Sequence, residues 1–446
     1  MNLASLKKIY DKLPYAVKAP FAKRLRNQLL NNPTFKEEYQ FLMMSDSVPG
    51  LEWSEEKFKE VQEHLLSETL CHAYNHSKYY REIFDMLGLP EDFSHPFETL
   101  KKLPLLTKET LQERLNDIIA DDGEGFEVTT GGTSGTPTTV MMANEAHYRE
   151  WAFIYHYWHK FGYDPRTSRL ATFRGVKLGD KPYVINPMYN EIRLNIYTLN
   201  RDTIESYVRA MTKYHVDFIY GYPSAVYAFC KLAQEEGIIL HGCYKAALLI
   251  SENLYPHQEA KIREVLGCPI AMFYGHTERA VFAERLDEGG YVFNRLYGVT
   301  EFSDRGEPIV TGFINPKTPL IRYLVDDEVK PTDDGKCEII GHRNSEVIYG
   351  KNGEEFRASS LDFHGSLSEI LPNYQFVQNN PGELIVRVLR SDNLSEEDKK
   401  KAVDLCRQRL NEDFVVTVEV ADYLAYAESQ ASRKYRLLCQ NIKENE

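Results

Sequence analysis

The sequence lacks the features that mark membrane, secreted and nucleic-acid-binding proteins. No apolar run approaches the roughly 20 residues needed to cross a bilayer, and the N-terminus has neither the apolar core nor the cleavage site of a signal peptide. Acidic residues outnumber basic ones by 66 to 53, and the resulting net charge of −13 argues against a general affinity for nucleic acid. We therefore expect a cytoplasmic protein with no transmembrane segment and no nucleic-acid partner.

Cysteine is also scarce. Its seven residues are odd in number, scattered, and never form a CxxC pair, which excludes a disulfide framework and a cysteine-rich zinc module. The composition, 43% apolar and 27% charged, excludes a largely disordered chain. At 446 residues the chain is long enough for two or three packed units, and 29 Tyr and 22 Phe can supply walls that stack on flat ligands.

The N-terminal segment reverses the charge of the rest. Residues 3–30 carry seven basic residues and one acid, with apolar residues at helical spacing and two prolines, Pro14 and Pro20, that should break a continuous helix. Such an arm can contact an anionic membrane or a partner, or it can pack on the main domain. We favour the packed arm and keep peripheral contact as the alternative.

Residues 55–88 are predicted to be helical throughout, with His72 and His76 one turn apart. Two histidines at this spacing can bind a metal, but no third ligand lies near them in the sequence. We therefore interpret the pair as structural and predict no zinc site.

From about residue 125 to 340, strands alternate with helices. Helices are predicted over 202–214 and 256–266, between short apolar runs at Leu170–Phe173, Val216–Gly221, Ala246–Ile250 and Ile270–Phe273. This alternation predicts a mainly parallel sheet with crossover helices, whose ligands bind beyond the carboxyl ends of the strands. Strand and turn patterning then dominates around Tyr291–Ile340.

The last hundred residues predict a smaller unit. Strands are expected over 383–389 and 414–420, and an amphipathic helix over 395–411 that begins with a capping box of Ser395 and Asp398. We place the domain boundary in the polar, turn-rich stretch near residue 343, which gives domains 1–342 and 343–446.

The most informative motif is Thr129–Val140, TTGGTSGTPTTV. Three glycines let the backbone approach a ligand closely, and the hydroxyls of Thr130, Thr133 and Ser134 can donate to phosphate oxygens. The motif is not a Walker A loop, because no Lys-Ser/Thr follows the last glycine. Alone, it is equally compatible with a flexible glycine-rich hairpin.

Three other segments favour a nucleotide site. In FYGHTE (273–278), Tyr274 can stack on a purine and Glu278 can bind Mg²⁺ through its carboxylate. PLIRYLVDD (319–327) ends in acids suited to the hydroxyls of a ribose, and RKYR (433–436) places Lys434 near the C-terminus. A lone lysine there is usually only a solvated surface charge.

Together and in this order, these segments resemble the adenylate-forming superfamily, which includes acyl-CoA synthetases, adenylation domains and luciferases. The likeness is strongest to the phenylacetate–CoA ligase branch and its CapK-type relatives in capsular polysaccharide biosynthesis. It includes HAYNHSKYYREIF (72–84) and LPLLTKETL (103–111), and it extends from about residue 60 to 440. The resemblance implies a multidomain α/β protein: a large N-terminal adenylate-forming domain and a small, mobile C-terminal α+β cap.

The resemblance also implies roles for individual residues. It assigns phosphate binding to the glycine-rich loop, adenine and ribose contacts to residues after three strands, a hinge contact to Arg343, and catalysis to Thr277, Glu278 and Lys434, with Glu278 also the Mg²⁺ ligand. The implied nucleotide-binding residues are Thr130, Gly131, Gly132, Thr133, Ser134, Gly135, Ser251, Glu252, Tyr274, Gly275, Asp327 and Arg343.

Three positions depart from the family pattern. Thr136 and Arg433 stand where Lys and Gly are frequent, and Asp326 stands where Gly usually precedes the ribose-binding Asp. These changes bear on the detailed geometry of the loops more than on nucleotide binding.

The acyl pocket is less clearly marked. Trp151 and Tyr155 belong to an aromatic stripe after the glycine-rich loop, a pattern that is more often core than pocket. Tyr222 follows a strand, and Arg174 can pair with a substrate carboxylate or phosphate or serve as a surface salt-bridge residue. We include all four as candidate pocket residues.

The implied reaction is the ATP- and Mg²⁺-dependent activation of a carboxylic acid as an acyl-adenylate, followed by transfer to a thiol, most simply coenzyme A. The alternative is transfer to an amine or hydroxyl of a sugar. A third hypothesis is a non-catalytic nucleotide-binding scaffold, which has no need of Glu278, Asp327 and Lys434 together. The sequence does not identify the acid or the oligomeric state.

Overall fold

The computed structural model describes residues 15–47, 52–89, 93–129, 138–175, 178–179, 181–285, 289–325, 327–332, 336–342, 347–357, 361, 367, 370–371, 374–388, 394–410, 414–421 and 437–442. The chain divides into two compact units. Unit 1 comprises Met1–Ala19, Ser168–Ile270 and His342–Glu446, and unit 2 comprises Pro20–Thr167 and Ala271–Gly341.

Unit 2 begins with helices. In chain order they are α2 (Tyr15–Leu30, which starts in unit 1), α3 (Pro33–Leu42), η1 (Met43–Ser47), α4 (Glu55–His76), α5 (Lys78–Leu87), α6 (Pro96–Lys102), α7 (Lys108–Glu113), α8 (Leu115–Ile118) and α9 (Ala146–His159). None of the helices in the described part of the chain combines the length and apolarity needed to cross a membrane.

The predicted break at Pro20 is wrong, because α2 runs through it. Pro20 is exposed and lies in the second turn, so the helix loses one main-chain hydrogen bond without a ring forced into the core. Ala22, Leu29 and Leu30 are buried, and the Arg26 guanidinium donates to the carbonyl of Arg166 at 3.0 Å. These contacts support the packed-arm interpretation for the part of the arm that the structure describes.

The prediction of one continuous helix over 55–88 is also wrong. The chain leaves the helix at Ser77, whose extended backbone (φ −112°, ψ 122°) ends α4 and caps α5. Ser77 is buried, and its hydroxyl donates to the carbonyl of Asp117 at 3.0 Å. A tertiary contact therefore sets this break, and helical periodicity alone did not reveal it.

The strands of unit 2 form several pieces. β1 (Gly125–Thr129) and β2 (Thr139–Ala143) pair antiparallel, and β8, β9, β10, β15 and β14 follow one another in that order across a sheet. β11 (Gly298–Phe302), β12 (Pro308–Gly312) and β13 (Tyr323–Leu324) form a smaller antiparallel sheet. The bounds of the other five strands are β8 Ile270–Gly275, β9 Phe282–Arg285, β10 Tyr291–Phe293, β14 Asp327–Pro331 and β15 Cys337–His342.

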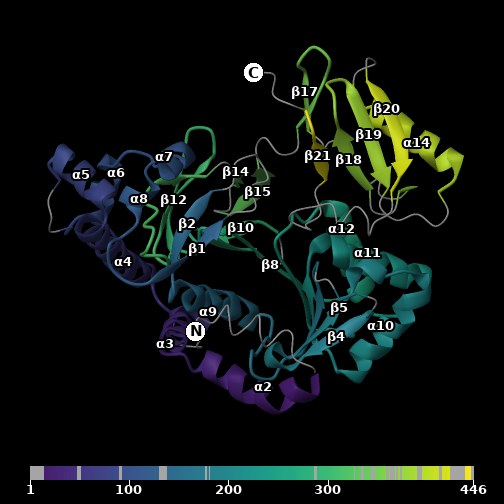
Figure 1. Cartoon of the computed structure of the whole chain (residues 1–446), viewed down its shortest axis with the longest axis horizontal. Coiled ribbons are helices and arrows are strands. Elements are labelled where there is room, and N and C mark those ends of the chain that lie inside the picture. The colour runs from purple at the N-terminus through teal and green to yellow at the C-terminus, as the bar shows by residue number, and fades with distance from the viewer. Residues whose placement is uncertain are drawn as a thin grey trace. The chain divides into compact units, whose positions relative to one another are not determined.

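Unit 1 contains the parallel strands. The order is β7-β6-β3-β5-β4, and β3 pairs parallel with β5 and β6, which pairs parallel with β7. The elements are drawn in teal in Figure 1: β3 (Leu170–Phe173), β4 (Tyr183–Asn186), η2 (Pro187–Tyr189), β5 (Glu191–Leu194), η3 (Ile196–Thr198), α10 (Arg201–Lys213), β6 (Phe218–Gly221), α11 (Pro223–Glu235), β7 (Ala246–Leu249) and α12 (Pro256–Leu266). The predicted α/β alternation is confirmed.

One glycine of unit 1 is required by close packing. Gly221, at the end of β6, has φ +153°, and a Cβ atom there would lie 2.1 Å from the carbonyl oxygen of Phe173. Only glycine lets the ends of β6 and β3 approach this closely. The residue that follows is the candidate pocket residue Tyr222.

The C-terminal part of unit 1 has a sheet of its own, in the order β20-β19-β18-β21, and Figure 1 shows α14 beside β20. Ser395 caps α14 with Asp398, as predicted. The elements are β16 (Val347–Tyr349), β17 (Glu355–Arg357), β18 (Tyr374–Gln378), β19 (Glu383–Val388), α14 (Glu396–Arg407), β20 (Val415–Val420) and β21 (Leu438–Gln440). The boundary near residue 343 lies in residues 343–346, outside the described residues, and stays a prediction.

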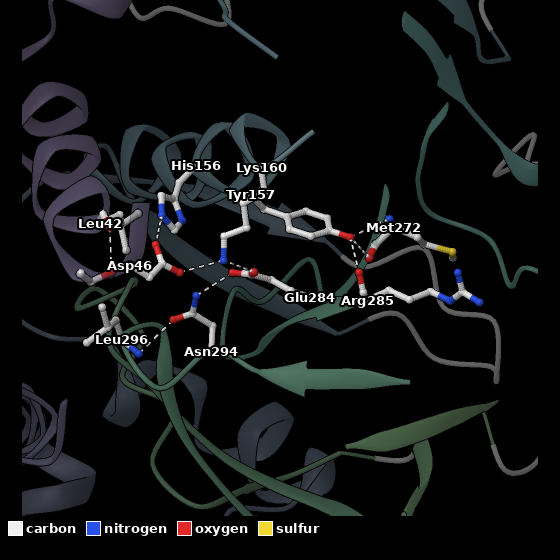
Figure 2. A network of polar contacts seen from close by, with 11 residues as sticks. Leu42, Asp46, His156, Tyr157, Lys160, Met272, Glu284, Arg285, Asn294 and Leu296 are labelled. Carbon is white, nitrogen blue, oxygen red and sulfur yellow. Dashed lines mark hydrogen bonds and ion pairs between the residues drawn. The ribbon is translucent and has the colours of Figure 1, made fainter. Parts of the chain in front are cut away.

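A polar network ties α9 to the hairpin of β8 and β9 (Figure 2). The Lys160 ammonium lies 2.8 Å from both Asp46 and Glu284, and His156, which is 1% exposed, lies 2.7 Å from Asp46. Burial raises the pKa of Asp46, but the hydrogen bonds to His156 and Lys160 outweigh it and hold the pKa far below its usual range. Glu284, which is 7% exposed, therefore has a compensating cation in Lys160.

The hydroxyl of Tyr157 closes the base of the same hairpin. The register Phe273↔Glu284 places Met272 opposite Arg285. Between these two residues, the Met272 N–H donates to the Tyr157 oxygen at 3.0 Å, and the Tyr157 hydroxyl donates to the Arg285 carbonyl at 2.7 Å (Figure 2). One side chain of α9 thus satisfies main-chain groups of both strands.

The Tyr157→Phe variant should destabilise the protein by about 1–3 kcal/mol, because it leaves buried main-chain groups without a partner. Urea unfolding followed by tryptophan fluorescence measures the change. Tyr183→Phe is the control, since Tyr183 is 37% exposed. A Tyr157→Phe midpoint equal to that of the control would show that the clamp contributes nothing.

Candidate functional site

Three predicted parts of the site lie outside the described residues. They are the glycine-rich loop from Thr130 to Thr136, the hinge residue Arg343, and Lys434 with its neighbour Arg433. Their roles stay predictions. The other candidate residues are described, and they fall into two groups, one in each unit.

The first group lies in unit 2, at the end of β8. The strand ends at Gly275, and the chain returns through His276, Thr277 and Glu278 before β9 begins. Thr277 is exposed and Glu278 is half-buried. The motif FYGHTE therefore forms the tip of the hairpin whose base Tyr157 closes, and its polar groups are presented beyond the strand end.

Tyr274, His276 and Asp327 form a hydrogen-bonded cluster. The Tyr274 hydroxyl donates to Oδ2 of Asp327 at 2.6 Å, and Nε2 of His276 lies 2.9 Å from the same oxygen. Asp327 is 3% exposed. The structure thus brings together two residues that sequence reasoning assigned to one nucleotide, although 53 positions separate them.

The electrostatics of this cluster fix the role of Tyr274. Burial, followed by the negative charge of Asp327 and its hydrogen bond, raises the pKa of the Tyr274 phenol well above its usual value, and Glu278 adds to the shift. Tyr274 therefore stays protonated across the physiological range. It can act as a hydrogen-bond donor and a flat apolar surface, but not as a base.

Sequence reasoning assigned no role to His276. Its ring packs edge-on against Tyr274, with centroids 4.8 Å apart and an interplanar angle of 76°. The signal was present, since the residue lies inside FYGHTE, but its partner Asp327 is far away in the chain. His276 is best understood as a second donor that positions the carboxylate of Asp327.

The residue after Glu278 holds the loop against α9. Arg279 has a left-handed backbone (φ +56°), which is uncommon for a residue with a side chain. Its guanidinium pairs with Glu150 at 2.8 Å. Burial raises the pKa of Glu150 more than the charge of Arg279 lowers it, and the ion pair joins the unusual turn beside Glu278 to α9.

The second group lies in unit 1 and includes Ser251 and Glu252, directly after β7. Ser251 is exposed with φ +66°, again a left-handed backbone. Oε2 of Glu252 accepts a hydrogen bond from the main-chain N–H of Ser224 at 3.2 Å. A carboxylate at the start of α11 is favoured by the helix dipole, so Glu252 anchors the turn and Ser251 is presented to solvent.

Arg174 follows β3 and lies between two tyrosines. Its guanidinium carbon is 5.8 Å from the ring centre of Tyr220 and 5.7 Å from that of Tyr222, and it donates to the Tyr220 hydroxyl at 3.3 Å. No carboxylate of the described residues lies within 4 Å of it. Arg174 is half-buried beside the two rings, and its pairing with a substrate anion stays a prediction alongside the salt-bridge interpretation.

A buried carboxylate supports this end of the sheet. Glu191 accepts hydrogen bonds from Thr172 at 2.7 Å, from Asn186 at 2.8 Å and from Arg193 at 2.7 Å. The three donors come from β3, β4 and β5. Burial lowers the pKa of Arg174, but the two tyrosines and the more distant negative charge of Glu191 raise it, and the net shift is upward.

The aromatic stripe of α9 packs against other aromatic side chains of unit 2. Tyr155 packs against Phe35 of α3 (5.9 Å), Trp158 (5.8 Å) and Tyr163 (5.6 Å). Trp151 is half-buried, 4.2 Å from the ring of His147. The ring contacts of Trp151 and Tyr155 are thus with aromatic side chains of unit 2, and their place in a substrate pocket stays a prediction.

Comparisons with known proteins give a consistent result. No family model matches the chain. The chain is 22% identical to Protein CapK of Staphylococcus aureus over 408 residues, which is 86% of this chain and 89% of CapK.

Two crystal structures of 2-hydroxyisobutyryl-CoA ligase in the postadenylation state share the fold. The complex with 2-HIB-AMP has a TM-score of 0.62 at 16% identity and covers 91% of this chain and 96% of the ligase. The complex with R3-HIB-AMP has a TM-score of 0.60 at 17% identity and covers 86% and 90%. The predicted resemblance is confirmed in sequence and in fold: the chain is similar to CapK and shares the α/β fold of 2-hydroxyisobutyryl-CoA ligase.

Proposed function

We propose that this chain is a ligase that uses ATP to activate a carboxylic acid as an acyl-adenylate and then transfers the acyl group, most simply to the thiol of coenzyme A. The observation that carries the proposal is the cluster of Tyr274, His276 and Asp327, which joins the predicted adenine and ribose contacts in one place. The fold shared with 2-hydroxyisobutyryl-CoA ligase supports it.

The cluster suits a nucleoside. Tyr274 offers an aromatic surface for a purine, and the carboxylate of Asp327 has up to four acceptor positions, of which Tyr274 and His276 occupy part. Ribose hydroxyls can therefore donate to the same carboxylate. A non-catalytic nucleotide-binding scaffold would use the same contacts, so the cluster supports nucleotide binding and the reaction needs a test of its own.

Charge compensation is the main task in adenylation, because a carboxylate attacks a phosphate and both are negative. We assign Mg²⁺ to Glu278, whose carboxylate lies at the hairpin tip, and the α-phosphate to Thr277 and the hydroxyls of the glycine-rich loop. Lys434 is the proposed catalytic cation. About 4 Å from an oxyanion, in a partly desolvated site, it would contribute on the order of 4 kcal/mol of gross attraction.

The acceptor has an alternative. The similarity to CapK favours an amine or hydroxyl of a sugar as acceptor, with an amide or ester as product, in capsular polysaccharide synthesis. ATP and coenzyme A, together with seven free thiols, suit a cytoplasmic location. We keep peripheral contact through residues 3–30 as an open proposal.

The decisive experiment incubates the protein with ATP, Mg²⁺ and a panel of acids, with and without coenzyme A. Pyrophosphate release with thioester formation supports the ligase. Release without a thioester favours the sugar acceptor, and ATP binding without release favours the scaffold.

Lys434→Ala should reduce pyrophosphate release by about 100-fold or more and leave ATP affinity within a few fold; Lys400→Ala is the control. Full activity of Lys434→Ala would remove it from the mechanism.

Asp327→Asn should weaken ATP binding by about ten- to a hundred-fold, since a hydrogen bond to a charged group is worth about 1.5–3 kcal/mol. Asparagine can still accept from Tyr274 and His276, which keeps the fold. Isothermal titration calorimetry gives the affinity, and Asp304→Asn, an exposed acid of the same unit, is the control. Equal affinities in both variants would place the ribose elsewhere.

Arg174→Gln should raise the KM of one anionic substrate, either the acid or coenzyme A, by about ten-fold, because glutamine keeps a donor but loses the charge. Steady-state kinetics with each substrate varied in turn identifies which one. Arg209→Gln, an exposed arginine of α10, is the control. Unchanged KM values for both substrates would assign Arg174 to packing against its tyrosines.

A further inference from the structure

Two histidines that the sequence left without a third ligand acquire one in the structure. His72 and His76 lie on one face of the last turn of α4, with ring centroids 4.9 Å apart. Asp122, 46 residues after His76, lies beside both rings in the loop between α8 and β1. All three belong to unit 2 and are separate from the cluster of Tyr274 and Asp327 in sequence and in hydrogen bonding.

We propose that His72, His76 and Asp122 bind a divalent transition-metal ion, with zinc the best match. Nε2 of His72 lies 3.6 Å from Oδ1 of Asp122, and Nε2 of His76 lies 3.9 Å from Oδ2. One ligand atom from each residue can be chosen so that all lie within 4.8 Å of one another. With bonds of about 2.0–2.1 Å, the ligand atoms of a tetrahedral zinc site are about 3.3 Å apart. Small side-chain rotations therefore close the site, and water can supply the fourth ligand.

A second carboxylate orients one of the histidines. Oδ1 of Asp121 lies 2.9 Å from Nδ1 of His76, on the far side of the ring from Asp122. This contact places a hydrogen on Nδ1 and turns Nε2 towards Asp122. Metal-binding histidines generally have such a partner on the other nitrogen, where it raises the basicity of the ligand. An incidental pair of surface histidines does not require it.

The loop that supplies Asp122 is held in place. The Lys317 ammonium donates to the carbonyls of Ala120, Asp122 and Gly123 at 2.7, 2.8 and 3.0 Å. The N–H of Asp121 donates to the carbonyl of His76, the last residue of α4, at 2.9 Å. A main-chain hydrogen bond thus connects α4 to the loop that carries Asp122. This connection lowers the entropic cost of assembling the site.

The donor set selects the metal. Two imidazoles and one carboxylate suit zinc, cobalt, nickel or copper, whereas Mg²⁺ and Ca²⁺ prefer oxygen ligands. In the metal-free protein Nε2 of His72 lies 3.2 Å from the carbonyl of Pro316 and can donate its proton there. Metal binding at Nε2 gives up this contact, and the neutral ring then carries its hydrogen on Nδ1.

The position suggests a structural role. The loop at 121–124 leads directly into β1, and the residue after β1 opens the glycine-rich motif. A metal that joins α4 to this loop would fasten the start of β1. We infer a stabilising ion and no part in the chemistry at Tyr274 and Asp327.

The test is calorimetric titration of chelator-treated protein with Zn²⁺, with Co²⁺ absorption as the spectroscopic signature of the ligands. The wild type should bind one Zn²⁺ that raises its Tm, and the double variant His72→Gln/His76→Gln should lose this binding by at least 100-fold. Asp121→Asn should weaken it by about 10–100-fold while keeping every direct ligand. Mg²⁺ and Ca²⁺ should leave the Tm unchanged.

His64→Gln is the matched control, since His64 lies on the same helix, is 70% exposed and faces only Glu68 at 3.3 Å. Circular dichroism of each metal-free variant checks that it is folded. If the double variant and His64→Gln bind Zn²⁺ with the same stoichiometry and affinity, the site does not exist. Stabilisation by Mg²⁺ or Ca²⁺ equal to that by Zn²⁺ would overturn the assignment to a transition metal.

Discussion

The hydrogen bond between Tyr274 and Asp327 is the contact on which the candidate nucleotide site depends. A carboxylate that is 3% exposed is costly unless donors surround it, and the Tyr274 hydroxyl and His276 ring supply them. The same bond joins the end of β8 to the first residue of β14. It is therefore both a condition of burying the acid and the reason that an aromatic ring and an acid stand together at one strand end.

This arrangement requires a rigid hairpin. The tip that carries His276 and Glu278 follows the end of β8. Its position therefore also depends on contacts at the base of the hairpin, where the Tyr157 hydroxyl lies between Met272 and Arg285 and Lys160 lies between two acids. Arg279 adds a lateral hold through its ion pair with Glu150. The anchors on the hairpin come from α9, from Lys160, which follows α9, and from Asp46 of η1. The polar side chains of α9 thus support the hairpin that carries the site, whereas Tyr155 packs against Phe35 and Tyr163.

Much of the fold could be read from the sequence because local pattern and tertiary structure agree there. The apolar run at Leu170–Phe173 is the strand β3, and the helix predicted over 256–266 has the same bounds as α12. Prediction was wrong where a distant residue decides the outcome. The break at Ser77 depends on the carbonyl of Asp117, and no helical periodicity contains that information. Pro20 is tolerated because of its exposed position, which composition alone does not give.

The same limit separates the two groups of histidines from their ligands. His276 lies in a motif that sequence reasoning singled out, and His72 and His76 have the spacing of a metal-binding pair, yet each needs a carboxylate 46 or more residues away. A sequence shows which donors lie near one another on one helix or one loop. The remaining ligand of each site, however, comes from a segment far away in the chain. Asp327 and Asp122 are the carboxylates that the fold brings to partners identifiable in the sequence. For Asp327 a family resemblance supplied the missing link. For Asp122 only the three-dimensional arrangement does, which is why the metal site is an inference from structure and not from motif.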